Sequence, residues 1–113
     1  MVTGSPSPVA MFAALADDTR WAVLETLAQG DGAAGRTASS LAEALPVTRQ
    51  AVAKHLAVLE AAGLVESWTA GRERRYRALG AELTALGRRL ERIGDAWEAR
   101  LGRLADIAER LEG

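Results

Sequence analysis

The C-terminal third of the chain carries a large apolar residue at every seventh position. These residues are Leu83, Leu90, Trp97, Leu104 and Leu111, and an interleaved line supplies Leu86, Ile93 and Ile107. A seven-residue repeat sustained this far predicts one long helix, from about residue 82 to 111, with an apolar seam that packs against another helix. At 1.5 Å per residue that helix is about 45 Å long. A small domain cannot cover so long a seam, so we expect part of it to meet a second subunit.

The composition is that of a small globular protein without a metal or redox centre. Of 113 residues, 49% are hydrophobic and 26% are charged, which suits a folded domain and not a disordered chain. The chain has no cysteine and one histidine, which excludes disulfides, thiolate metal sites and cysteine nucleophiles. No Ser-His-carboxylate set has plausible spacing. We therefore expect no enzyme, no catalytic residue, no bound metal and no cofactor.

The sequence gives no sign of a membrane protein. It has no apolar run of the roughly 20 residues that would cross a bilayer. Its first residues also lack the basic and apolar regions of a signal peptide. We therefore expect a cytoplasmic protein without membrane association.

Hydrophobic spacing and helix-breaking residues divide the chain into three parts. Residues 1–8 are polar and proline-rich and predict a disordered leader. Residues 9–80 alternate helical and turn signals, and residues 81–113 hold the long helix. The predicted elements of the middle part are helices over 9–16, from a cap at Asp17 or Asp18 to about 28, over 37–45 and over 48–62, then strands over 65–68 and 75–79. The predicted fold class is mainly α with a small β-hairpin.

Two of these helices are joined by a turn of very few residues. Pro46 ends the first helix and Thr48 is placed to cap the second, which predicts a helix-turn-helix. The second helix opens with polar and basic residues, while Val52, Leu56 and Leu59 form an apolar stripe on its inner face. A helix built in this way can enter a DNA major groove and read base edges with its first turns.

Positive charge is concentrated around this motif, although the whole chain has a net charge of −1. Residues 47–79 contain six basic and three acidic side chains, a local excess of three positive charges. Arg72, Arg74 and Arg75 lie at the hairpin turn, where they can reach phosphates or the minor groove. A basic patch on a nearly neutral chain is typical of a nucleic-acid-binding face.

Two sets of candidate binding residues follow from these patterns. Arg49 can bond to guanine, Gln50 to adenine, and Ala51 can accept a thymine methyl, while hydroxyls at helix starts suit phosphates. The candidate DNA-binding residues are Thr37, Ser39, Ser40, Thr48, Arg49, Gln50, Ala51, Lys54, His55, Arg72, Arg74 and Arg75. The candidate dimer-interface residues are Met11, Phe12, Leu15, Leu83, Leu86, Leu90, Ile93, Trp97, Leu101 and Leu104.

Four segments carry a resemblance to a known family. They are Phe12–Arg20, Leu41–Leu45, Ala51–Val65 and Gly71–Arg77, within a match over residues 9–111. In these segments the chain resembles the ArsR-type winged helix-turn-helix repressors of bacteria. The resemblance implies a winged helix-turn-helix with N- and C-terminal dimerisation helices. It also implies a homodimer that binds a double-stranded DNA operator and is released by a ligand.

The sequence departs from the metal-sensing members of that family. Those members use a cysteine motif on the helix before the recognition helix, or histidine and carboxylate ligands on the last helix. The matching region Leu41–Ala44 has no cysteine, and the last helix has Asp95 and Glu98 but no histidine. The resemblance therefore implies a member that does not sense metals. The sequence also permits a small apolar effector at the dimer interface.

A second hypothesis stays open beside the regulator. A helical adaptor dimer would use the same long helix to recruit another coiled coil. That hypothesis predicts no salt-dependent DNA binding, whereas a regulator predicts a steep salt dependence. Two interpretations stay open for Trp21 and Trp97: packing residues, which is the favoured interpretation, or the lining of a small-molecule pocket.

Overall fold

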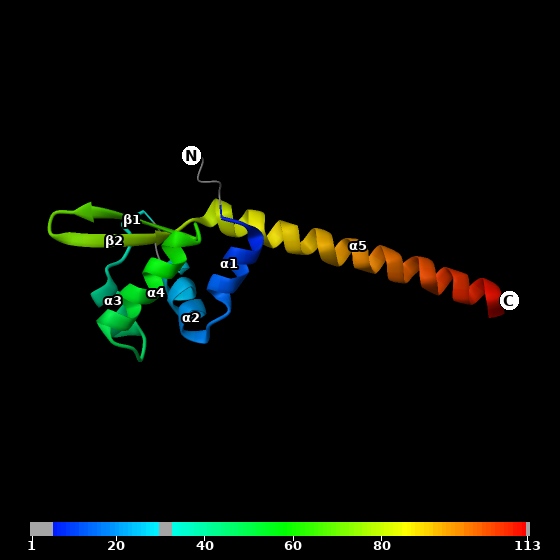
Figure 1. The fold of residues 1–113 in the computed structure, drawn as a ribbon, viewed down its shortest axis with the longest axis horizontal. Coiled ribbons are helices and arrows are strands. Elements are labelled where there is room, and N and C mark those ends of the chain that lie inside the picture. Colours follow the sequence, from blue (N-terminus) through cyan, green and yellow to red (C-terminus); the bar gives the residue numbers. More distant parts are fainter. Residues whose placement is uncertain (1–5, 30–32, 113) are drawn as a thin grey trace. The chain divides into compact units, whose positions relative to one another are not determined.

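The computed structural model describes residues 6–29 and 33–112 (Figure 1). Its helices and strands are α1 (Pro8–Leu15), α2 (Asp18–Ala28), α3 (Ala38–Ala44), α4 (Arg49–Ala61), β1 (Val65–Ala70), β2 (Glu73–Ala78) and α5 (Gly80–Glu112). The chain divides into two compact units, Met1–Glu82 and Leu83–Gly113. The expected fold class, mainly α with one small hairpin, is confirmed. The predicted leader lies outside the described residues as far as residue 5, and its last residue, Pro8, already belongs to α1.

Each of the first four helices begins at a side chain that caps it. The caps Ser7, Asp17, Thr37 and Thr48 have extended backbone, and each side-chain oxygen accepts a hydrogen bond from the N–H three residues further on. The N–O distances are 2.9–3.1 Å. Because a cap satisfies an N–H that has no partner inside the helix, these residues fix where the helices start. The predicted cap at Thr48 is confirmed. Of the two residues that the sequence offers in each case, Asp17 and not Asp18 caps α2, and Thr37 and not Ser39 caps α3.

The helix α4 ends in a glycine-terminated cap. Gly63 has a φ of +77°, a value that residues with a side chain rarely adopt. Its N–H donates to the carbonyl of Glu60 at 3.0 Å, and the Leu64 N–H donates to the carbonyl of Leu59 at 3.0 Å. This pair of bonds is a Schellman motif, and it confirms Gly63 as the residue that follows the helix.

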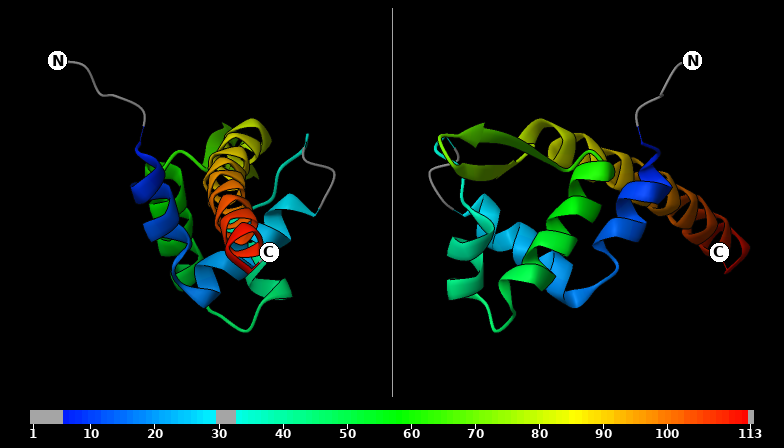
Figure 2. Two further views of the ribbon diagram at one scale, coloured as in Figure 1. Left: turned by 90° about the vertical axis from the view of Figure 1, so that its right-hand side faces the viewer. Right: turned by 60° about the vertical axis from the view of Figure 1, so that its left-hand side comes forward.

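An apolar core lies between α4 and the elements around it. The helix α4 contacts α1, α2, α3 and β1 (Figure 2). The predicted inner stripe, Val52, Leu56 and Leu59, is fully buried. The buried partners from neighbouring elements include Met11, Ala14, Val23, Leu24, Leu27, Leu41 and Val65. Because this stripe faces the core, the opposite face of α4 is directed outward.

The hairpin is longer and its turn is tighter than the sequence predicts. The strands β1 and β2 pair antiparallel from Val65–Ala78 to Ala70–Glu73, which leaves Gly71 and Arg72 as the turn. The predicted strands stopped at 68 and restarted at 75. Gly71 has a φ of +64°, the sign that a two-residue type II′ turn requires at its first central position. The ladder of hydrogen bonds therefore continues to the tip.

A short segment before α3 joins the edge of the hairpin. Arg36 forms an isolated antiparallel bridge with Tyr76, with N–O distances of 2.9 and 2.8 Å. The sequence predicted a loop over residues 29–36. The structure places the last residue of that segment beside β2, so the start of α3 is fastened to the hairpin.

The helix α5 runs without interruption through the second unit. From Gly87 to Glu112 every residue is exposed. The seam residues Leu90, Ile93, Trp97, Leu101, Leu104, Ile107 and Leu111 are 46–83% exposed. An amphipathic helix with an exposed apolar stripe is stabilised when a partner covers that stripe. Among the described residues, none of the helices combines the length and the apolar character needed to cross a membrane.

Candidate nucleic-acid interface

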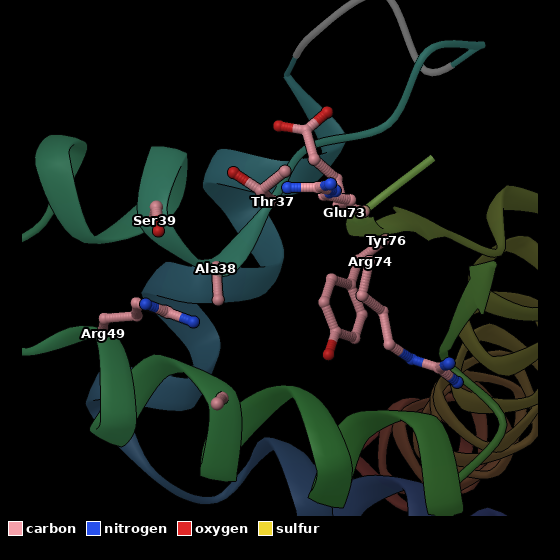
Figure 3. Close-up of a pocket in the computed structure, with 9 residues that line it drawn as sticks. Thr37, Ala38, Ser39, Arg49, Glu73, Arg74 and Tyr76 are labelled. Carbon is pink, nitrogen blue, oxygen red and sulfur yellow. The ribbon is translucent and has the colours of Figure 1, made fainter. Parts of the chain in front are cut away.

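A polar hollow of about 310 Å³ lies between the starts of α3 and α4 and the strand β2 (Figure 3). Its lining residues are Thr37, Ala38, Ser39, Arg49, Ala53, Arg72, Glu73, Arg74 and Tyr76. The lining includes three guanidinium groups and one carboxylate, so the hollow carries a net positive charge. Guanidinium and hydroxyl groups are the donors that phosphate oxygens prefer.

The first turns of α4 present polar side chains to solvent. Arg49, Gln50 and Lys54 are exposed, and Ala51 is half-buried. Within residues 6–29 and 33–112, the three polar side chains form no hydrogen bond or ion pair with the protein. Their donors and acceptors are therefore available to a ligand. The cap Thr48 is also exposed, although its hydroxyl already accepts the Ala51 N–H.

His55 is less exposed than the candidate residues Arg49, Gln50 and Lys54 of the same helix. It is half-buried and does not line the hollow. Instead, it acts on the carboxylate of Asp17 at the start of α2. The pKa of Asp17 is lowered from 3.8, first because the carboxylate accepts the backbone N–H of Arg20, and then because Arg20 and His55 stabilise the charged form.

The two hairpin arginines that follow each other in sequence have different surroundings. We call the β1–β2 hairpin with its turn, residues 65–78, the wing. Arg74 shares a face of the wing with Tyr76 and lines the hollow. Arg75 alternates to the other face of β2, and its guanidinium pairs with Glu73 at 3.0 Å and donates to the carbonyl of Ala34 at 3.2 Å. Arg75 is thus engaged in joining β2 to the segment before α3.

The three candidate hydroxyls of α3 are also divided. Thr37 and Ser39 line the hollow, and Ser39 is exposed. Ser40 is half-buried, and its hydroxyl accepts a hydrogen bond from Nε of Arg36 at 3.0 Å. The same arginine donates to the Ser40 carbonyl at 3.1 Å. Ser40 therefore helps to fix the start of α3, while Thr37 and Ser39 face the hollow.

Sequence reasoning missed several residues that line the hollow. Tyr76 is the largest of them, and Ala38, Ala53 and Glu73 complete the set. The strand alternation contained the signal for Tyr76, because residues 74 and 76 must share a face of β2. The two alanines carried no signal, since small residues fit a core, a helix surface or a ligand site equally well.

The candidate dimer residues are also placed in different surroundings. Met11 is buried at 8% exposure, Leu15 is half-buried, and Phe12 remains 39% exposed. On α5, Leu83 is half-buried and Leu86 is buried. The exposed members are Leu90, Ile93, Trp97, Leu101 and Leu104. The residues free to meet a partner are therefore mainly those in the middle of α5.

Known proteins resemble this chain along most of its length. Residues 15–67 match the family model of a helix-turn-helix domain. The HTH-type transcriptional regulator Rv2034 of Mycobacterium tuberculosis is 45% identical over 87 residues, which cover 77% of this chain and 78% of that protein. The solved structure of an ArsR-like transcriptional regulator from Rhodococcus sp. RHA1 is 55% identical, with a TM-score of 0.78, and the match covers 89% of this chain and 92% of that one.

A third relative carries a description of its assembly. It is the homodimeric winged helix-turn-helix DNA-binding domain of a possible ArsR-family regulator from Mycobacterium bovis. The identity is 28% and the TM-score 0.61, and the match covers 77% of each chain. This chain has a two-stranded hairpin that follows α4 directly in sequence. This chain, with its α3–turn–α4 motif and its wing, therefore belongs to the ArsR-type family of helix-turn-helix transcriptional regulators.

Proposed function

We propose that this chain is a homodimeric repressor that binds an inverted-repeat DNA operator through α4 and the wing. The observation that carries the proposal is the positively charged hollow between α3, α4 and β2. Beside it, the start of α4 exposes polar side chains with no partner in the described protein. Together they offer one surface for base edges and another for phosphates.

In this proposal α4 is the recognition helix and lies in the major groove. Arg49 forms a bidentate pair with guanine, Gln50 pairs with adenine, and Ala51 contacts a thymine methyl. The sugar-phosphate backbone beside that groove passes the hollow, where Arg72 and Arg74 donate to phosphate oxygens. The first set selects a sequence, and the second set supplies affinity for any DNA.

The exposed seam of α5 supports the homodimer. A two-fold axis lets the same apolar residues of two copies cover each other, so a second copy of this chain is a suitable partner. The homodimeric state described for the Mycobacterium bovis domain adds support. Two recognition helices related by such an axis meet half-sites about 34–36 Å apart, which predicts an inverted repeat.

The proposal includes release by an effector that is not a metal. The chain contains no cysteine, and its one histidine is on α4 and not on α5. Neither of the ligand sets that the metal-sensing relatives use is therefore complete in the sequence. A small apolar molecule at the dimer interface is the kind of effector that we propose.

The proposal is tested by fluorescence anisotropy of the full chain on labelled duplex DNA. The probes are a fragment from the region upstream of its own gene and a shuffled duplex of the same composition, each over a series of salt concentrations. We expect tighter binding to the upstream fragment, two protomers per site, and an affinity that falls steeply with salt. Equal affinity for both duplexes would contradict sequence specificity. No binding at low salt would instead favour the adaptor dimer.

Base reading by α4 gives a separate prediction for Arg49→Ala. We expect this change to weaken operator binding by about 1–3 kcal/mol and to leave the affinity for shuffled DNA much less affected. The reason is that a lost guanine contact matters only where the guanine is present. The matched control is Arg88→Ala, which removes the same charge from an exposed position on α5. Equal losses on both duplexes would assign Arg49 to phosphate contact.

A further inference from the structure

Three side chains from three elements form a hydrogen-bonded chain between the wing and the recognition helix. Ser67 of β1 donates its hydroxyl proton to Oε2 of Glu60 in the last turn of α4, at 2.5 Å. The same hydroxyl oxygen accepts a hydrogen bond from Nη2 of Arg74 of β2, at 2.7 Å. A hydroxyl has one proton to give, so the carboxylate fixes its direction and leaves a lone pair facing the guanidinium.

The hydrogen bond to Ser67 restrains the Arg74 side chain but occupies only one nitrogen of its guanidinium. Arg74 is exposed, whereas Ser67 and Glu60 are half-buried. Across the described part of the chain, Arg74 forms no ion pair and no side-chain hydrogen bond other than the one to Ser67. A guanidinium carries five N–H donors, so the others remain available to a phosphate. The restraint removes rotamer freedom that a binding arginine would otherwise lose on the DNA.

Arg74 lines the hollow, so the restraint acts on a guanidinium that is available for phosphate binding. Figure 3 shows the side chain leaving β2 beside Tyr76, with its guanidinium turned away from Arg49. The two arginines therefore lie toward opposite ends of the hollow. Glu60 lies eleven residues after Arg49 on α4. Eleven residues are about three helical turns, so the two residues lie on the same face of the helix. Fastening Arg74 through Ser67 to Glu60 thus fixes the wing relative to the base-reading turn.

We propose that Ser67 is a positioning residue, which holds Arg74 ready for the DNA backbone by linking it to Glu60 of the recognition helix. The inference rests on the proposed DNA-binding function and assigns to Ser67 a role within that same interface. Arg74 is the residue that touches DNA, and Ser67 acts through it. The neighbouring Arg75 has no such role, because it is already committed to Glu73 and to backbone carbonyls on the opposite face.

The test is a double-mutant cycle with Ser67→Ala, Arg74→Ala and the pair of changes, measured by anisotropy on the upstream and shuffled duplexes. We expect Ser67→Ala to weaken binding to both duplexes by about 3- to 10-fold, the effect of freeing one long side chain. In the Arg74→Ala background the same change is expected to have no further effect, because the arginine that it positions is gone. Ser67→Thr keeps a hydroxyl on a strand and is expected to restore binding.

Thr69→Ala is the matched control for this cycle. Thr69 lies on the same face of β1 and directly opposite Arg74, but its hydroxyl takes no part in the chain of bonds. We expect its removal to leave DNA affinity unchanged. Thermal unfolding of every variant shows whether a loss of affinity merely follows a loss of stability.

The outcomes separate this inference from the proposed function. Additive effects of Ser67→Ala and Arg74→Ala on a chain that binds DNA would overturn the positioning role alone. Tighter binding by Ser67→Ala would also overturn it, since the bonds would then be holding Arg74 away from DNA. A wild-type chain that binds neither duplex at low salt would overturn the proposed function and the inference together.

Discussion

Trp97→Ala is expected to shift the chain from dimer to monomer at concentrations where the wild type is dimeric. Trp97 is at the centre of the α5 seam and is 55% exposed in the single chain, so its large apolar surface is available to a partner. Truncating a buried tryptophan costs about 3–5 kcal/mol, and a two-fold interface loses one on each side. Even the lower figure raises the dimer dissociation constant by about 100-fold or more. Sedimentation velocity over a concentration series measures the shift.

The control for this prediction is Glu98→Ala on the next residue of the same helix. Its side chain is about 100° away around the helix axis, outside the seam. We expect Glu98→Ala to leave the monomer–dimer equilibrium almost unchanged. A Trp97→Ala protein that sediments like the wild type would remove α5 from the dimer interface. In that case the exposed α1 residue Phe12 would become the next position to test.

Gly35→Ala is expected to cause a large loss of stability in the first unit. Gly35 has a φ of +66°, and a Cβ built there would lie 2.6 Å from Cη2 of Trp68 and 2.7 Å from the carbonyl oxygen of Tyr76. Left-handed backbone strain and overpacking each cost about 1–3 kcal/mol. Together they are expected to lower the free energy of unfolding by about 2–6 kcal/mol and Tm by roughly 10 °C or more. Thermal unfolding followed by circular dichroism measures the change.

Gly71→Ala separates the two causes of this loss. Gly71 has nearly the same φ, +64°, but no heavy atom lies within 4 Å of an added Cβ. We expect it to lose only the cost of the left-handed backbone, about 1–2 kcal/mol. A Gly35→Ala protein no less stable than Gly71→Ala would mean that the Trp68 ring and the Arg36–Tyr76 bridge can move aside easily.

The helices could be predicted from the sequence because their signals are local. Thr48 caps α4 through an N–H three residues away, and Gly63 ends the helix through bonds to its last turn. The fold class follows from these signals and from the apolar spacing between them. The exposed middle of α5 also agrees with its seven-residue repeat.

The parts that could not be predicted depend on contacts between distant residues. The bridge between Arg36 and Tyr76 joins positions forty residues apart, and nothing near Arg36 in the sequence indicates it. The different surroundings of Arg74 and Arg75 arise in the same way. Strand alternation places these two arginines on opposite faces, but Arg74 finds its partner on β1, and Arg75 donates to carbonyls of the segment before α3, forty residues away.

The two faces of α4 have a consequence for how this regulator can change over evolution. Its inner face holds Val52, Leu56 and Leu59, which are fully buried, while the outer positions Arg49 and Gln50 are exposed and form no hydrogen bond or ion pair with the described protein. Substitutions at the outer positions leave core packing untouched, so they carry little penalty in folding. If the proposed base contacts of Arg49 and Gln50 hold, duplicated copies of such a gene can therefore acquire different target sites without passing through unstable intermediates. For the same reason, the outer face of α4 is a suitable place to redirect the protein to a chosen DNA sequence by design.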